Sequence, residues 1–274
     1  MVNMWHGVPL KRFGYMVSEK QWFNLSRMFT YVCVNSDNLV GVMKASFRCQ
    51  DEQIVVNGNP RCDYLFQKSN YIQAMESLRG NWKKTIIWLP TYRKSIDGTE
   101  DSAQCAQFQD TDSLHKLNDY LLCKDVLLII KPHPLQRADE VTVSEMSNIK
   151  FIDNGLLCSN HIPLYSLLGE TDALITDYSS VFADYLLINK PIAFMVDDMD
   201  SYAGKRGFSF DDPLNYMPGI KIRNQAEILG FIDSVLVGKD EWCEERNRVC
   251  SLLNQYKDGR NAERLVDIII RKVD

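Results

Sequence analysis

The fold class of this chain is indicated most clearly by Leu174-Ile175-Thr176-Asp177-Tyr178-Ser179-Ser180-Val181-Phe182-Ala183-Asp184-Tyr185-Leu186. Residues 173–175 are a short apolar run typical of a buried strand, and helical spacing begins after the two serines. A strand, a tight turn and a helix in this order indicate an α/β fold. Because a helix N-terminus attracts anions, the turn is a candidate phosphate site; an ordinary serine N-cap is the alternative.

Other apolar runs alternate with helical patterns along the chain, which predicts an α/β fold with a mainly parallel sheet. We expect strands at residues 30–34, 53–56, 85–89, 126–130, 151–152, 173–175 and 192–196. We expect helices at residues 70–78, 112–122, 163–168, 226–235, 242–256 and 262–272, and a long loop at 203–218.

Composition narrows the class of protein. The 274 residues correspond to one large or two small domains, and a hydrophobic content of 45% is enough for a core. The net charge of -5 argues against a general nucleic-acid surface. The eight cysteines have no metal-ligand spacing, so we expect free thiols in a reducing cytoplasm. No signal peptide and no run long enough to span a bilayer is evident.

Three predicted strands end in polar residues suited to binding phosphate. Thr91-Tyr92-Arg93 follows the strand at 85–89, Lys131-Pro132-His133-Pro134 follows 126–130, and Asp177-Tyr178-Ser179-Ser180 follows 173–175. Ligands of open parallel sheets bind outside the carboxyl ends of the strands. Convergence at this edge is what a nucleotide-diphosphate site would need; simple solvent exposure of polar strand ends is the alternative.

Several short motifs together resemble the CDP-glycerol glycerophosphotransferase family. They are Trp5-His6-Gly7-Val8-Pro9-Leu10-Lys11, Gly58-Asn59-Pro60-Arg61-Cys62-Asp63, Leu89-Pro90-Thr91-Tyr92-Arg93, Lys131-Pro132-His133-Pro134, Thr176-Asp177-Tyr178-Ser179-Ser180, Arg206-Gly207-Phe208, Pro218-Gly219 and Asp258-Gly259-Arg260-Asn261-Ala262. The resemblance implies a GT-B architecture, with the active site between two Rossmann-like domains. It also implies transfer of glycerol phosphate, or a related alditol phosphate, from CDP-glycerol to a hydroxyl of a teichoic-acid or capsular-polysaccharide acceptor, with release of CMP.

One departure from the family pattern concerns the N-terminal domain. The Trp-His-Gly motif begins at residue 5, whereas in the family it lies well inside that domain. We therefore expect a partial N-terminal, acceptor-side lobe at 1–80 and a complete CDP-alditol-binding domain at 81–274. An exposed sheet edge and apolar surface would cause self-association. We expect nucleotide binding to persist and transferase activity to be weak or absent.

Two histidines are the candidate catalytic residues. His6 is the expected general base, because an imidazole can accept a proton at neutral pH; a structural histidine beside Trp5 is the alternative. His133, between two prolines, is expected to bind the pyrophosphate and stabilise the leaving CMP; a buried histidine bonded to a carbonyl is the alternative.

The expected substrate-binding residues are Arg93, Lys131, Asp177, Ser179, Ser180 and Arg206. Arg93 suits bidentate phosphate binding, with a surface ion pair as the alternative. Arg206 is a candidate to close over the diphosphate, with a solvated arginine as the alternative. Asp177 is expected to orient a ribose or a histidine, since a carboxylate repels phosphate.

The remaining expectations concern a possible metal site, the substrates and the alternative functions. The cluster Asp197-Asp198-Met199-Asp200 indicates a solvated acidic turn, with an Mg²⁺ site as the alternative. The resemblance implies CDP-glycerol as donor, a membrane-linked polyol-phosphate or polysaccharide acceptor, and a cytoplasmic location at the inner face of the plasma membrane. A nucleotide-sugar-dependent GT-B glycosyltransferase or epimerase, and an inactive nucleotide-binding fragment, are the competing interpretations.

Overall fold

The computed structural model describes residues 1–18, 25–67, 82–90, 111–132, 146–196, 207–210 and 212–273. The predicted helix at 70–78 and the acidic cluster at 197–200 lie outside these residues. So do three candidate site residues: Arg93, His133 and Arg206.

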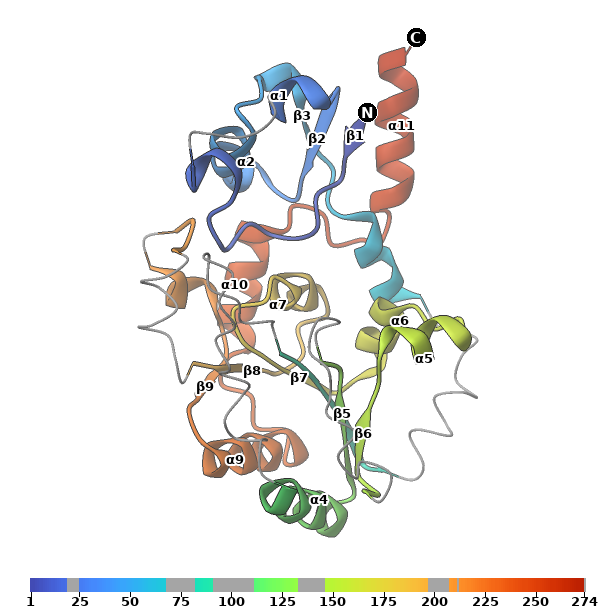
Figure 1. Ribbon diagram of the computed structural model, residues 1–274, viewed down its shortest axis with the longest axis vertical. Helices are drawn as coiled ribbons and strands as arrows, with labels where there is room; N and C mark the ends of the chain where they lie inside the picture. Colours follow the sequence, from blue (N-terminus) through green and yellow to red (C-terminus); the bar gives the residue numbers. More distant parts are fainter. Residues whose placement is uncertain are drawn as a thin grey trace.

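The larger part of the molecule is built on a parallel sheet in the order β6-β5-β4-β7-β8-β9 (Figure 1). Its strands are β4 (Lys84–Leu89), β5 (Val126–Ile130), β6 (Ile149–Phe151), β7 (Ala173–Thr176), β8 (Ile192–Met195) and β9 (Ile220–Ile222). Numbered from β4, this is the 3-2-1-4-5-6 order of dinucleotide-binding folds. The strand order reverses between β4 and β7, so their carboxyl ends mark the crevice where such folds bind ligands.

Helices cover both faces of this sheet, because neighbouring side chains of a strand point to opposite faces. On β4, Ile86 and Trp88 contribute to one core, and Ile87 and Leu89 contribute to the other. The first core includes α4 (Thr111–Lys124) and α9 (Gln225–Leu236). The second includes α5 (Asn154–Ser159), α6 (Leu164–Glu170), α7 (Val181–Tyr185) and α10 (Cys243–Leu253).

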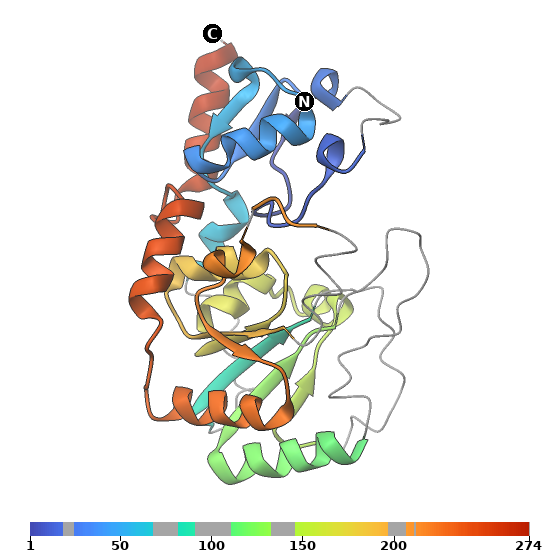
Figure 2. The ribbon, with the colours of Figure 1, turned by 90° about the vertical axis from the view of Figure 1, so that its left-hand side faces the viewer.

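A smaller parallel sheet, in the order β1-β2-β3, forms the N-terminal lobe (Figures 1 and 2). Its elements are β1 (Val2–Asn3), β2 (Tyr31–Val34), β3 (Ile54–Val56), α1 (Leu25–Met28) and α2 (Val40–Phe47). Its buried side chains, such as Val8, Val32 and Phe47, belong to the same hydrophobic core as Phe182 of α7. The two lobes therefore share one continuous core.

Short 3₁₀ helices connect the main elements. They are η1 (Gly14–Met16), η2 (Asp37–Leu39), η3 (Asp51–Gln53), η4 (Pro60–Phe66), η7 (Leu186–Ile188) and η8 (Pro213–Tyr216). The helix η4 packs against α6 so closely that a Cβ at Gly169 would come within 2.5 Å of the Leu65 carbonyl oxygen. Glycine at 169 is what permits this contact.

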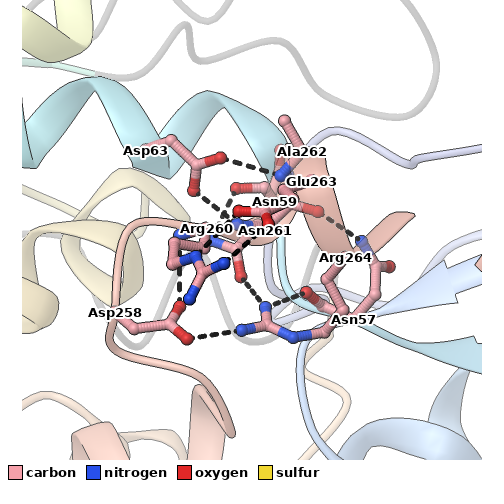
Figure 3. A network of polar contacts seen from close by, with 9 residues as sticks. All are labelled: Asn57, Asn59, Asp63, Asp258, Arg260, Asn261, Ala262, Glu263 and Arg264. Carbon is pink, nitrogen blue, oxygen red and sulfur yellow. Dashed lines mark hydrogen bonds and ion pairs between the residues drawn. The ribbon is translucent and has the colours of Figure 1, made fainter. Parts of the chain in front are cut away.

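The last helix, α11 (Asn261–Val273), returns to the N-terminal lobe and runs beside its sheet (Figure 1). Asp63 of η4 accepts hydrogen bonds from the backbone N–H groups of Asn261 and Ala262, at 2.9 and 2.8 Å (Figure 3). A carboxylate there satisfies helix-terminal donors and interacts favourably with the helix dipole. Arg264 donates to the Asn57 carbonyl and to Asp258. The family-like motifs at 58–63 and 258–262 thus contact each other.

The longer predicted elements among the described residues are confirmed, and several shorter ones were missed, namely β1, β9, α1, α2 and α5. The sequence gives little sign of β1, which has two residues, or of β9, where Lys221 interrupts an apolar pair. The apolar residues of α2 surround the helix rather than forming one stripe. The predicted helix at 242–256 was too long, because α10 ends at Leu253 and Asn254 is extended.

Two further expectations concern the thiols and the membrane. The seven cysteines among the described residues are free thiols. Within that same part of the chain, no helix combines the length and the hydrophobicity needed to cross a bilayer.

Candidate functional site

The N-terminal lobe reaches the carboxyl edge of the large sheet through Gly7. A Cβ on Gly7 would lie 2.3 Å from the Ser180 Oγ and 2.9 Å from the Arg61 Nη2. Gly7 also has a φ of +143°, a region that is open essentially only to glycine. Two predicted site elements, the Trp-His-Gly motif and the Ser179-Ser180 turn, therefore meet in the structure.

His6 precedes this contact and presents an exposed imidazole beside Trp5. The two rings lie 3.9 Å apart between centroids, and the Trp5 ring stacks on Phe13 at 4.3 Å. Trp5 has a φ of +50°, which is strained for a non-glycine residue, and its N–H donates to the Asn3 side chain at 2.8 Å. Strain of this kind persists only where the surroundings impose it. Here the aromatic packing and the Asn3 bond hold the turn that presents His6.

The environment of His6 favours its neutral form. Partial removal from water, followed by the positive charge of Arg61, lowers the pKa of His6 below its ordinary value, with its own backbone opposing the change. A neutral imidazole has a free lone pair at neutral pH. The surroundings of His6 therefore favour the form that can accept a proton.

Arg61, Asp184 and Tyr165 form a buried polar cluster behind His6. Asp184 of α7 is fully buried and accepts 2.6 Å hydrogen bonds from the Arg61 Nη2 and from the Tyr165 hydroxyl. Arg61 uses its Nη1 to donate to the His6 carbonyl oxygen at 2.8 Å. Sequence analysis placed Arg61 in a family-like motif and Asp184 in its opening stretch but assigned neither a role. The available signal was a carboxylate among apolar helix positions.

The turn before α7 differs from a simple helix N-cap. Ser180 is helical in backbone and its side chain makes no capping bond, while the Ser179 Oγ accepts only a long 3.5 Å bond from the Val181 N–H. The N–H groups of Phe182 and Ala183 bond back to the carbonyls of Ser179 and Ser180. Because these donors are used and α7 is short, anion binding here would depend mainly on the two hydroxyls.

Lys131 and Asp177 occupy the ends of β5 and β7, as predicted. Both are buried, with exposed fractions of 9% and 1%. Burial lowers the pKa of Lys131, and the nearby Asp153 opposes this change. Between β7 and β4, the Thr176 hydroxyl donates to the Leu89 carbonyl at 2.9 Å, which ties the two strands together where the strand order reverses.

A second contact between the lobes is made by the residues that follow Arg206 in the sequence. Lys11 pairs with Phe208 in an antiparallel bridge, the Ser209 N–H donates to the Leu10 carbonyl at 2.9 Å, and the Arg12 Nε donates to the Phe208 carbonyl at 3.0 Å. Residues 207–209 are therefore held against the N-terminal lobe.

The part of the chain that the structure describes contains no group of three His, Cys, Asp or Glu side chains that could hold a metal ion. The acidic cluster at residues 197–200 lies outside that part. The described chemistry of the site therefore consists of an imidazole, hydroxyls, a lysine and a buried ion pair.

Curated relatives of this chain are enzymes of teichoic acid synthesis. It is 26% identical over 284 residues to the teichoic acid glycerol-phosphate primase of Bacillus subtilis (strain 168), covering 98% of this chain and 67% of the relative. It is 28% identical to the teichoic acid poly(ribitol-phosphate) polymerase of Bacillus spizizenii, covering 98% and 43%. With the teichoic acid glycerol-phosphate transferase of Staphylococcus aureus it shares 26% identity, covering 98% and 71%. The chain thus spans roughly 43–71% of the length of these relatives.

Solved structures with the same fold include the wall teichoic acid polymerase TagF, with a TM-score of 0.77, 23% identity and coverage of 98% of this chain and 67% of that one. A putative UDP-N-acetylglucosamine 2-epimerase from Listeria monocytogenes gives a TM-score of 0.53 at 17% identity, covering 89% and 60%. These likenesses confirm the GT-B-like α/β fold. The family model described as CDP-glycerol:poly(glycerophosphate) glycerophosphotransferase matches residues 1–271. The chain therefore belongs to the CDP-glycerol:poly(glycerophosphate) glycerophosphotransferase family.

Proposed function

We propose that this chain transfers glycerol phosphate, or a related alditol phosphate, from its CDP-activated form to a hydroxyl of a teichoic-acid-type acceptor and releases CMP. Family membership supports this reaction class, and the names of the relatives include both glycerol-phosphate and ribitol-phosphate enzymes. CDP-glycerol is the first candidate donor, and CDP-ribitol is the second.

The single observation that carries the proposal is the contact between Gly7 and Ser180. It brings a neutral histidine from one lobe to the strand-order reversal of the other lobe, where nucleotide diphosphates bind in such folds. A base and a phosphate-binding turn are the two elements that phosphoryl transfer to a hydroxyl requires.

In the proposed reaction, His6 accepts the proton of the acceptor hydroxyl. The acceptor oxygen attacks the phosphorus that carries the alditol, the bond from that phosphorus to the bridging oxygen breaks, and CMP leaves with the bridging oxygen. Ser179 and Ser180 donate hydrogen bonds to the phosphate oxygens, and Lys131 offsets their negative charge. We assign His133, Arg93 and Arg206 to the pyrophosphate and the leaving CMP, and Asp177 to orienting the ribose or a histidine.

The test is CMP release by the purified chain with CDP-glycerol, CDP-ribitol or a UDP-sugar, each with and without a polyol-phosphate acceptor. Binding of the same nucleotides is measured by calorimetry. We expect tighter binding of CDP-alditols than of UDP-sugars, and CMP release from a CDP-alditol that depends on the acceptor even where its rate is low. Equal or tighter binding of UDP-sugars would instead support a nucleotide-sugar enzyme.

The location and the domain division are part of the same proposal. We place the acceptor on a membrane lipid at the inner face of the plasma membrane, with an acceptor-side lobe at 1–80 and a nucleotide-binding domain at 81–274. The return of α11 to the small sheet would add it to the first lobe. Co-sedimentation with acceptor-loaded vesicles tests the location, and sedimentation velocity tests the expected self-association.

A further inference from the structure

We propose that Asp184, acting through Arg61, is a positioning residue that holds His6 against the Ser179-Ser180 turn. The inference rests on the proposed function, in which His6 is the base. It assigns a task to a buried carboxylate that lies in neither the predicted nucleotide site nor the predicted acceptor site.

The first step is the convergence of three donors on one carboxylate. Asp184 is fully buried, and it receives hydrogen bonds from Arg61, from Tyr165 of α6 and from the Cys62 thiol at 3.3 Å. Burial first, and then the Asp184 charge, raise the pKa of Cys62, so this thiol stays protonated and can donate. The carboxylate is thereby satisfied from two different elements.

The second step is the other end of Arg61. One guanidinium nitrogen binds Asp184 and the other binds the His6 carbonyl oxygen, while the guanidinium carbon lies 5.1 Å from the centre of the Tyr165 ring. A planar guanidinium fixes the directions of both bonds at once. The backbone of His6 is therefore linked to α7 through a rigid group.

The third step is the position of Asp184 on its helix. Asp184 follows Ser180 by four residues, which is about one helical turn, so both lie on one side of α7. The same short helix thus holds the phosphate-side hydroxyls at its start and the His6 linkage at its end. A displacement of α7 would move the hydroxyls and the His6 linkage together, so the distance between the base and the hydroxyls would be kept.

Stability alone does not account for this pair. Burying an ion pair costs desolvation that can exceed the attraction gained, and apolar residues of similar volume often stabilise a protein as well or better. What apolar residues cannot reproduce is a directed bond to the His6 carbonyl. The Arg61 charge has a second effect, because it favours the neutral imidazole.

A second arginine–aspartate pair of the chain serves as a control. Arg246 of α10 is 1% exposed, is paired with Asp240 and donates to the Asn189 side chain and carbonyl. Asp240→Asn removes the charge of a carboxylate paired with an arginine, as Asp184→Asn does, and no hydrogen bond links this second pair to the Trp5-His6-Gly7 turn among the described contacts.

The first measurement is the pKa of the His6 imidazole in the 274-residue chain, followed by NMR and assigned with His6→Gln. We expect Arg61→Gln to raise this pKa, Arg61→Lys to keep it low because the charge remains, and Asp240→Asn to leave it unchanged. A folded Arg61→Gln protein whose His6 titrates as in the wild type would overturn the electrostatic half of the inference. Since no turnover is needed, this result stands even if CDP-alditols prove not to be substrates.

The second measurement is steady-state CMP release. Misplacing a reacting group by about 1 Å can cost on the order of 10²-fold in rate. We expect Asp184→Asn to lower kcat by up to about this factor with little change in KM for the donor, and Arg61→Lys to recover part of the loss seen in Arg61→Gln. If Asp184→Asn is poorly folded, Tyr165→Phe removes one bond and should lower kcat less but in the same direction. The positioning role would be refuted if Asp184→Asn and Tyr165→Phe both fold and have the same kcat as the control Asp240→Asn.

Discussion

Arg61 and Asp63 lie two residues apart on η4, yet they bind different parts of the molecule, and the two contacts have different consequences. Arg61 binds Asp184 and the His6 carbonyl at the carboxyl edge of the large sheet. Asp63 binds the first N–H groups of α11 (Figure 3). The first contact has a strained turn and an exposed histidine beside it. The second is a carboxylate from a distant part of the chain that binds the first N–H groups of a helix.

The difference shows how one short element can serve both chemistry and stability. Helix capping satisfies backbone donors that would otherwise need water, so Asp63 contributes to folding directly. The attraction in the Arg61–Asp184 pair is offset by the desolvation of its buried carboxylate, and the pair fixes the geometry of the turn that carries His6. Variants at the two contacts should therefore behave differently. Changes at the Arg61 contact should mainly reduce activity, and changes at Asp63 should mainly reduce stability.

The largest expected effect is on turnover when His6 is replaced. His6→Ala should lower CMP release by about 10²–10⁴-fold, because it removes the general base. Its urea midpoint should stay near that of the wild type, since the side chain is exposed. His115→Ala, on the exposed surface of α4, is the control and should retain full activity. Unchanged CMP release in His6→Ala would remove His6 from the mechanism.

The pH dependence of CMP release gives a separate test of the same residue. Partial removal from water and the Arg61 charge lower the pKa of His6, so the base is protonated at a lower pH than an ordinary histidine. The acidic limb of the kcat profile should therefore lie below that range in the wild type and move to higher pH in Arg61→Gln. An acidic limb that does not move would show that another group controls it.

Loss of the helix cap should have its main effect on stability. Asp63→Ala removes a carboxylate bonded to two backbone N–H groups, and a hydrogen bond to a charged group contributes roughly 1.5–3 kcal/mol. We expect a lower free energy of unfolding in urea titration and an unchanged pKa of His6. Asp51→Ala, which breaks the exposed Lys44–Asp51 pair, is the control and should leave the midpoint close to the wild type. An Asp63→Ala protein as stable as this control would refute the capping role.

Filling the space at Gly7 should moderately reduce both the rate of CMP release and the stability of the protein. Gly7→Ala would place a methyl group 2.3 Å from the Ser180 Oγ, at a φ that alanine avoids. Strain at such a position costs roughly 1–3 kcal/mol, and relief by moving the turn would displace His6. We expect slower CMP release with a modest loss of stability, measured on the same samples. Wild-type kinetics would mean that the Gly7–Ser180 contact is absent in the active state.

The smallest expected effect is a gain in stability when Gly41 is replaced by alanine, as a comparison with Gly7. Gly41 lies inside α2, and a Cβ there meets nothing within 4 Å. Gly41→Ala should raise the free energy of unfolding by about 0.5–1 kcal/mol and leave CMP release unchanged. Destabilisation by Gly41→Ala would show that backbone freedom does not explain the loss at Gly7.

Local signals in the sequence were sufficient for the larger elements. The run at residues 126–130 is uniformly apolar and short, which suits a strand buried on both faces, and it matches β5 residue for residue. The turn after residue 175 was visible because a buried strand, two serines and a helical spacing follow one another. The family could be identified because its motifs occur in order along nearly the whole chain.

Contacts between distant residues could not be predicted in this way. Arg61 and Asp184 each appear in a recognisable stretch, but nothing in either stretch shows that they bind each other. The return of α11 to the small sheet is equally invisible, because its amphipathic pattern shows that one face is buried and not which surface covers it.

The sequence by itself determined the fold class, the family and the residue types available for chemistry, because these depend on local spacing and composition. Only the tertiary structure decided which of those residues meet. It brought Gly7 against Ser180, linked His6 to α7 through Arg61, and turned Asp63 towards α11. The physical reason is that burial of one shared core brings the lobes together, and a buried carboxylate such as Asp184 must then find its donors across that interface.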